Sequence, residues 1–164
     1  MNTPRTTVVS MIGSGTSSRV QMLEDGRLVA VEASLAAEAG FGVPVALTRA
    51  VFDDCVAWTD ADAERTSVWL QDETGRLWDV LWMAAQAARR VRQRSRVTFE
   101  LCRVPRDRGR IPIDDLEDAA YERLCRVRLV ADIGPGDDGM PVITILQPQE
   151  AHQPGEQGDG GGEA

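Results

Sequence analysis

The stretch Gly75-Arg76-Leu77-Trp78-Asp79-Val80-Leu81-Trp82-Met83-Ala84-Ala85-Gln86-Ala87-Ala88-Arg89-Arg90 decides the fold of this chain. Its apolar residues recur with the spacing of one helical face, so the stretch predicts an amphipathic helix. That helix begins at Asp72 or Thr74, either of which can cap it, and runs to about Gln93. Its apolar arc comprises Leu77, Val80, Leu81, Ala84, Ala87, Ala88 and Val91, with Trp78 at the edge. We expect this helix to be the centre of the fold.

Trp82 and Met83 lie outside the apolar arc. In one interpretation, a second layer formed by residues 43–58 covers them. In the other, Trp82 is an exposed anchor beside Arg89 and Arg90, and tryptophan with arginine is the composition of a binding hot spot. The position of Trp82 beyond the edge of the arc favours partial exposure.

Shorter elements surround this helix. Before it, the capping and stop signals predict helices over residues 17–26, 32–39 and 48–58, a strand over residues 27–31, an extended segment at 43–45 and an irregular acidic segment at 59–70. After it, alternation predicts strands over residues 97–102, 121–131 and 142–146, with a tight turn at 134–139. The fold class is therefore α+β, with helices packed on one face of a small antiparallel sheet that forms a three-stranded C-terminal meander.

The domain organisation is one domain between two loose ends. Residues 1–16 are predicted to be a flexible arm, and residues 17–147 a single α+β domain. Residues 148–164 are rich in Gln, Pro, Gly and acidic residues and have no aliphatic residue larger than alanine. Such a segment cannot offset its ordering entropy by burial, so we expect a disordered acidic tail.

The charge is unevenly distributed along the chain. The formal net charge is −8, and all 18 basic residues are arginine. Residues 71–110 hold ten arginines against five acidic residues, whereas residues 111–164 hold three arginines against twelve. An acidic chain with a basic middle is a poor general nucleic-acid binder, because phosphate neutralisation requires a clustered positive surface.

The usual catalytic sets are missing from the sequence. The one histidine, His152, lies in the predicted tail, so histidine-dependent nucleophilic catalysis has no base and a histidine-ligated metal site has no ligands. Cys55, Cys102 and Cys125 lack metal-ligand spacing and are interpreted as small buried apolar residues. Acidic pairs occur at Asp53-Asp54, Asp114-Asp115, Glu117-Asp118 and Asp137-Asp138. Such pairs usually lie on solvated faces and in turns. We predict no enzyme, no cofactor and no metal.

Several motifs of this chain have a familiar form. They are Gly75 through Met83, Val45 through Thr48, Cys55-Val56, Gly134 through Gly139 and Pro141 through Ile145. Together, over residues 27–147, the chain resembles an uncharacterised family of small proteins carried by plasmids and phages. That family has no assigned activity. The resemblance implies an accessory gene of a mobile genetic element, and so a bacterial host.

The leading hypothesis is a non-enzymatic protein that binds and inhibits or modulates a host protein, in particular an anti-defence, anti-CRISPR-like inhibitor. An acidic inhibitor can occupy a basic nucleic-acid channel by presenting carboxylates where phosphates bind. The candidate partner-binding residues are Trp82, Met83, Arg89, Arg90, Asp114, Asp115, Glu117 and Asp118, with Asp60, Asp62 and Glu64 as further carboxylates. A solvated acidic loop is the other interpretation of these carboxylates.

The alternative is a regulatory or nucleic-acid-handling accessory protein. It would use a strip formed by Arg89, Arg90, Arg92, Arg94 and Arg96 to contact phosphates. Arginines at the C-terminal end of a helix also suit the helix dipole without any ligand. The chain opens with no signal peptide and has no apolar run near the ~20 residues of a membrane span. We therefore expect a cytoplasmic protein, with a homo-oligomer left open.

Overall fold

The computed structural model describes residues 17–91, 94–106 and 118–152. The helical elements are α1 (Arg19–Glu24), α2 (Ala33–Ala39), α3 (Arg49–Val51), the π-helix η1 (Phe52–Val56), α4 (Asp60–Thr66), α5 (Glu73–Arg90), α6 (Asp118–Cys125) and the 3-10 turn η3 (Glu150–His152). The strands are β1 (Leu28–Ala30), β2 (Val45–Thr48), β3 (Arg96–Cys102), β4 (Arg126–Pro135) and β5 (Pro141–Leu146). The predicted N-terminal arm and residues 153–164 of the predicted tail lie outside the described residues.

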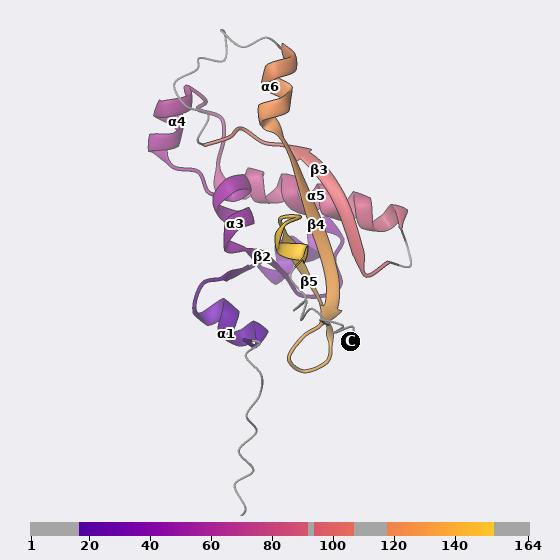
Figure 1. Ribbon diagram of the computed structural model, residues 1–164. Helices are drawn as coiled ribbons and strands as arrows, with labels where there is room; N and C mark the ends of the chain where they lie inside the picture. The colour runs from indigo at the N-terminus through magenta and orange to yellow at the C-terminus, as the bar shows by residue number, and fades with distance from the viewer. Residues whose placement is uncertain (1–16, 92–93, 107–117, 153–164) are drawn as a thin grey trace, which may run out of the picture.

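The strands form one mixed sheet in the order β1-β2-β5-β4-β3 (Figure 1). β3, β4 and β5 pair antiparallel in chain order, as expected for the C-terminal part. However, β1 and β2 extend the sheet to five strands, and β2 runs parallel to β5. The α+β class is confirmed, whereas the prediction of a three-stranded, purely antiparallel sheet is wrong.

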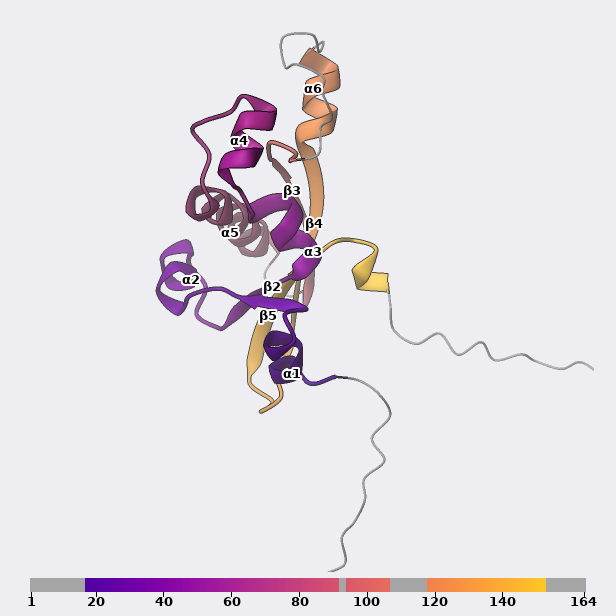
Figure 2. The same cartoon turned by 90° about the vertical axis from the view of Figure 1, so that its left-hand side faces the viewer.

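The two faces of the sheet are covered differently. Helices α2 and α5 lie on one face, and the turn η3 lies on the other (Figure 2). Under η3, Val130, Leu146 and Ala151 form a small apolar cluster of their own. The main core lies between the sheet and α5, and its largest fully enclosed side chains include Leu47, Leu81, Leu129 and Ile145. The predicted packing of helices on one face is therefore observed for α2 and α5, but η3 also covers part of the other face.

The predicted helix signals are confirmed where a side chain caps the helix. Ser18, Thr48 and Asp72 each accept a hydrogen bond from a backbone N–H of the first turn that follows. Gly40 ends α2 with φ of 102°, a left-handed conformation that side-chain-bearing residues rarely adopt. In α5, Val80, Leu81 and Ala84 are fully buried, as predicted. The rest of the predicted arc is only partly buried, and Arg76 and Ala85 lie inward instead.

Several segments differ from the prediction. The helix predicted over residues 48–58 consists of α3 and the π-helix η1, which ends at Val56. The acidic segment 59–70 contains α4, which begins with a capping box formed by Thr59 and Asp62. The predicted strand at 121–131 begins only at Arg126, because its first residues belong to α6. β3 ends at Cys102, which pairs with Arg126, so the residues before Arg126 have no strand to pair with. The one further bond runs from the Arg103 N–H to the Cys125 carbonyl. A helix satisfies the backbone groups of the residues before Arg126 instead.

The C-terminal order extends further than predicted. The carboxylate of Glu150 accepts hydrogen bonds from the Thr48 hydroxyl at 2.9 Å and from the backbone N–H of Gln147 at 2.7 Å. The Arg96 guanidinium donates to the carbonyl of Ala151 at 3.1 Å. These bonds hold residues 148–152 on the sheet, so the predicted start of disorder at residue 148 is wrong.

Replacing Leu81 with alanine tests the packing of α5. Leu81 is fully buried, so Leu81→Ala should lower the free energy of unfolding by about 2–5 kcal/mol through lost burial and a residual cavity. Chemical denaturation measures this loss. Met83→Ala, on the same helix but 37% exposed, is the matched control and should cost less. Equal denaturation curves for Leu81→Ala and the parent would mean that the wrong face of α5 is inward.

Candidate functional site

Trp82 and Met83 lie on the outer side of α5. Trp82 is 42% exposed and Met83 is 37% exposed, which agrees with the expected partial exposure. The Trp82 ring stacks on the ring of Trp78, one turn earlier, with 6.0 Å between centroids and 23° between planes. This stack holds the Trp82 ring in a defined position at the surface, since an aromatic pair at this spacing is mutually attractive.

A groove runs between Trp82 and the edge strand β3. Its volume is about 530 Å³, and it is lined by Asp79, Trp82, Met83, Glu100, Leu101, Cys102 and Arg126. Apolar and aromatic walls with a few polar groups are typical of a binding groove. The groove exists because α5 packs on β3 with its buried face and leaves Trp82 beside the strand.

A second hollow of about 600 Å³ continues this groove along β3. Met83 and Glu100 line both. The remaining lining residues of the second hollow are Gln86, Ala87, Arg90, Val91, Val97, Thr98, Phe99 and Arg128. The C-terminal half of α5 therefore borders β3 along much of its length, and both hollows follow the strand.

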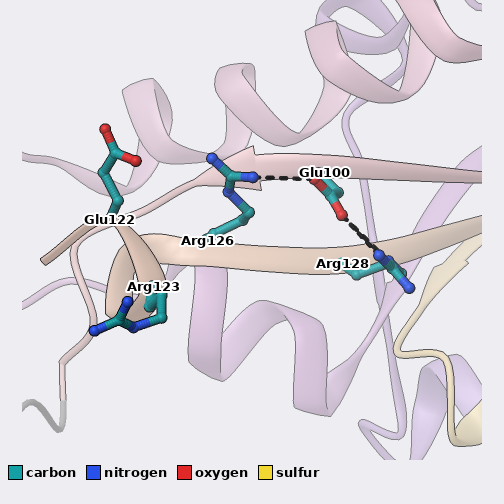
Figure 3. Close-up of a pocket in the computed structure, with 5 residues that line it drawn as sticks. All are labelled: Glu100, Glu122, Arg123, Arg126 and Arg128. Carbon is teal, nitrogen blue, oxygen red and sulfur yellow. Dashed lines mark hydrogen bonds and ion pairs between the residues drawn. The ribbon is translucent and has the colours of Figure 1, made fainter. Parts of the chain in front are cut away.

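The third hollow, of about 480 Å³, is lined by residues of β3, β4 and α6 (Figure 3) and shares Glu100, Arg126 and Arg128 with the other two. Here Glu100 forms ion pairs with two arginines of β4, at 2.9 Å to Arg128 and 3.9 Å to Arg126. Glu122 and Arg123 of α6 complete the lining. The three hollows together hold four arginines, Arg90, Arg123, Arg126 and Arg128, against three carboxylates, Asp79, Glu100 and Glu122. This surface is slightly positive on a chain of net charge −8.

The structure separates the arginines predicted from the sequence. Arg90 lines the second hollow, whereas the Arg89 guanidinium lies against Gly40. Arg96 pairs with Asp132 at 3.2 Å and also donates to Ala151. The predicted strip thus loses Arg96 to protein contacts, and Arg92 lies outside the described residues. The nucleic-acid interpretation of this strip stays a prediction.

The predicted acidic surface is mostly not described. Asp114, Asp115 and Glu117 lie outside the described residues, and Asp118 is described only as the first residue of α6. Among the further carboxylates, Asp62 contradicts the prediction because it is buried. It accepts hydrogen bonds from Thr59 and pairs with Arg65 and Arg106, so it cannot stand in for a phosphate at the surface.

The most unexpected residue is Arg76, which is buried in α5 with 3% of its surface exposed. Its guanidinium donates to the carbonyls of Asp54 at 3.2 Å, Val56 at 3.2 Å and Val104 at 3.1 Å. It also lies over the ring of Trp58, 4.7 Å from the centroid. Sequence reasoning missed this role. The available signal was its place one turn before Val80, on the buried stripe of the helix.

Further ion pairs surround Arg76. The Arg103 guanidinium binds both carboxylate oxygens of Asp54, at 2.8 and 3.1 Å, and Arg106 binds Asp62 at 2.9 Å. Burial lowers the pKa of Arg76 from its ordinary value. Burial acts to raise the pKa of Asp62, but hydrogen bonds from Thr59 and Arg106 lower it below its ordinary value. This network joins η1, α4, α5 and the chain after β3.

Most of the remaining reactive groups are engaged in structure, but Cys102 is exposed, so the prediction that all three cysteines are buried is wrong. Burial and the nearby Asp54 carboxylate raise the pKa of the Cys55 thiol to about 12, so the thiolate nucleophile does not form near neutral pH. Asp137 caps α1 by accepting from the backbone N–H groups of Arg19 and Val20. Asp138 accepts from the N–H of Met140. Within the described residues, no group of three or more His, Cys, Asp or Glu side chains is placed to hold a metal ion.

Substitution of Arg76 tests whether it holds α5. Arg76→Met keeps much of the length of the side chain but leaves one buried and two partly buried carbonyls without this donor, which should cost about 3 kcal/mol of unfolding free energy. Arg76→Lys should restore part of this, since one ammonium cannot reproduce the planar fork. Chemical denaturation measures both. The exposed Arg89→Met is the matched control, and an equal loss in Arg76→Met and Arg89→Met would contradict the structural role of Arg76.

Comparison with known proteins gives one match. No helix in the described part of the chain is long and apolar enough to cross a membrane. Neither the curated proteins nor the solved structures contain a match to this chain. A family model described as a family of unknown function, DUF6573, matches residues 15–151. Because the match covers most of the chain, the chain belongs to the DUF6573 family.

Proposed function

We propose that this protein acts by binding another protein through the surface formed by α5 and β3, with Trp82 at its centre. The observation that carries the proposal is the half-exposed Trp82 ring, which is stacked on Trp78 and borders the 530 Å³ groove beside Met83. The exposed apolar surface of the Trp82 ring stays in contact with water unless a partner covers it.

The energetics of binding favour this surface. Interface energy concentrates in a few residues, mainly Trp, Tyr and Arg, that occupy well-packed pockets. The stack on Trp78 already restricts the Trp82 ring, so binding loses little side-chain entropy there. Arg90 and Arg126 lie at the borders of the two hollows next to α5 and can pair with carboxylates of a partner. The surface therefore combines an apolar anchor with charged groups around it.

The proposal keeps only part of the function that was expected from the sequence. It keeps a non-enzymatic protein that binds a partner through Trp82, Met83 and Arg90, and it leaves out the acidic residues at 114–118. The inhibition of a host defence complex and the mobile-element origin stay predictions from the sequence. The nucleic-acid alternative also stays a prediction from the sequence, and one of the arginines that it would use, Arg96, pairs with Asp132.

Replacement of Trp82 tests the proposal. Trp82→Ala should leave the fold nearly intact, because the side chain is 42% exposed, and should cost less stability than Leu81→Ala. It should weaken partner binding by about 2 kcal/mol, or roughly thirtyfold in Kd. The tagged parent and variant proteins are expressed in cells, and the amounts of the proteins captured with each are compared by quantitative mass spectrometry.

The matched control is Trp69→Ala, which removes a 67% exposed tryptophan from the connection between α4 and α5. It should capture the same proteins as the parent. If the parent and Trp82→Ala recover the same proteins in the same amounts, this surface is not the binding site.

A further inference from the structure

Strand β3 is an edge of the sheet. It pairs with β4 on one side, and the part of the chain that the structure describes provides no strand on its other side. The edge is seven residues long, from Arg96 to Cys102. An edge strand presents a row of unpaired N–H and C=O groups, which another strand can pair with.

The hydrogen-bond phase of β3 identifies which groups face the open edge. Arg103 N–H donates to the Cys125 carbonyl at 2.9 Å, and Ile133 N–H donates to the Ser95 carbonyl at 2.6 Å. In an antiparallel pair, such bonded positions alternate with unbonded ones. With the observed register, Val97, Phe99 and Leu101 are therefore bonded to β4. The N–H and C=O groups at positions 96, 98, 100 and 102 point away from β4, toward the open edge.

Helix α5 provides a wall along this edge. The C-terminal end of α5 continues past β3 in the view of Figure 1. The 600 Å³ hollow lies between that part of the helix, with Met83, Ala87 and Val91, and positions 97–100 of β3. A strand added at the edge would have alternate side chains on the α5 side, where the lining is largely apolar.

The opposite side of the edge carries charge. Glu100 lies across from Arg128 in the register of β3 and β4, and strand alternation places both, with Arg126, on the sheet face opposite to the buried side chains of β3. Their long side chains also reach the two hollows beside α5. One carboxylate is shared between the two arginines, at 2.9 and 3.9 Å. The side chains that an added strand places here lie close to more positive than negative charge. Acidic residues at these positions complement the surface.

We propose that the partner docks an extended segment onto β3 as an additional strand, with apolar side chains against Met83, Ala87 and Val91 and acidic side chains beside Arg126 and Arg128. This inference rests on the proposed function and names the ligand class of the same surface. In this mode, backbone hydrogen bonds to positions 96, 98, 100 and 102 supply affinity, and the alternating side chains supply specificity.

The test variant is Thr98→Pro, with Thr98→Val as its matched control. Position 98 points its N–H to the open edge, so proline removes a donor to the added strand but no bond to β4, and proline is tolerated at such edge positions. Valine keeps the N–H and the strand preference. Thermal melting of both variants checks that the fold is retained.

The probe is a phage-displayed library of short random linear peptides, selected on the full chain. The expected result is enrichment of sequences that alternate apolar and acidic residues. Their affinity should fall about tenfold or more in Thr98→Pro and stay unchanged in Thr98→Val, because the proline removes a hydrogen bond and adds a clash. Synthetic peptides methylated at alternate backbone nitrogens give an independent readout on the parent protein. Methylation of the peptide nitrogens that bond to β3 should abolish binding, and methylation of the nitrogens that point away from β3 should have little effect.

Three results would overturn strand addition. The first is that no peptides are enriched. The second is that the enriched peptides bind equally well to Thr98→Pro and after backbone methylation. The third is a dimer in sedimentation that Thr98→Pro converts to a monomer, which would make a second copy of this chain the occupant. Failure of the proposed function looks different. If the protein partners captured from cells depend on Trp82 but not on Thr98→Pro, the binding surface stands and only the strand mode is wrong.

Discussion

The position of α5 depends on one buried guanidinium. Arg76 donates to carbonyls at the end of the π-helix and to the carbonyl of Val104 after β3, and it covers the ring of Trp58. These segments are far apart in the chain and have no strand pairing with one another. An arginine suits this role because its planar fork carries several donors at fixed angles. Desolvating that charge is costly, so the site is stable only while its carbonyl acceptors stay in place.

The proposed binding surface follows from this constraint. With Arg76, Val80, Leu81 and Ala84 directed inward, the helical period leaves Trp82 and Met83 directed outward beside β3. The sheet order makes β3 an edge, so the same geometry places an aromatic ring next to unpaired backbone groups. Neither feature alone identifies a binding site. Together they provide an apolar anchor and a template for an extended chain.

The sequence predicts the features that depend on neighbouring residues. Asp72, one of the two caps predicted for α5, the inward position of Val80, Leu81 and Ala84 and the alternation in β3 are all local patterns, and the structure confirms them. The parallel pairing of β2 with β5 joins residues about one hundred positions apart, which no local pattern records. Arg76 was missed for the same reason, since an arginine on an apolar stripe can be recognised as buried only when its acceptors are known. The exposure of Trp82 could be predicted from the helix, but the groove could not, because β3 forms its other wall.

Strand β3 is an open edge beside α5, and amide hydrogen exchange along β3 tests this arrangement most directly. In the free protein, the amides of Val97, Phe99 and Leu101 should be protected by their bonds to β4, whereas those of Thr98 and Glu100 should exchange much faster. NMR spectra of the labelled protein, recorded after transfer to heavy water, resolve the individual positions. Alternating fast and slow exchange is the result that the structure predicts. Equal, strong protection at Thr98 and Glu100 would show that the edge is already covered and would contradict the account.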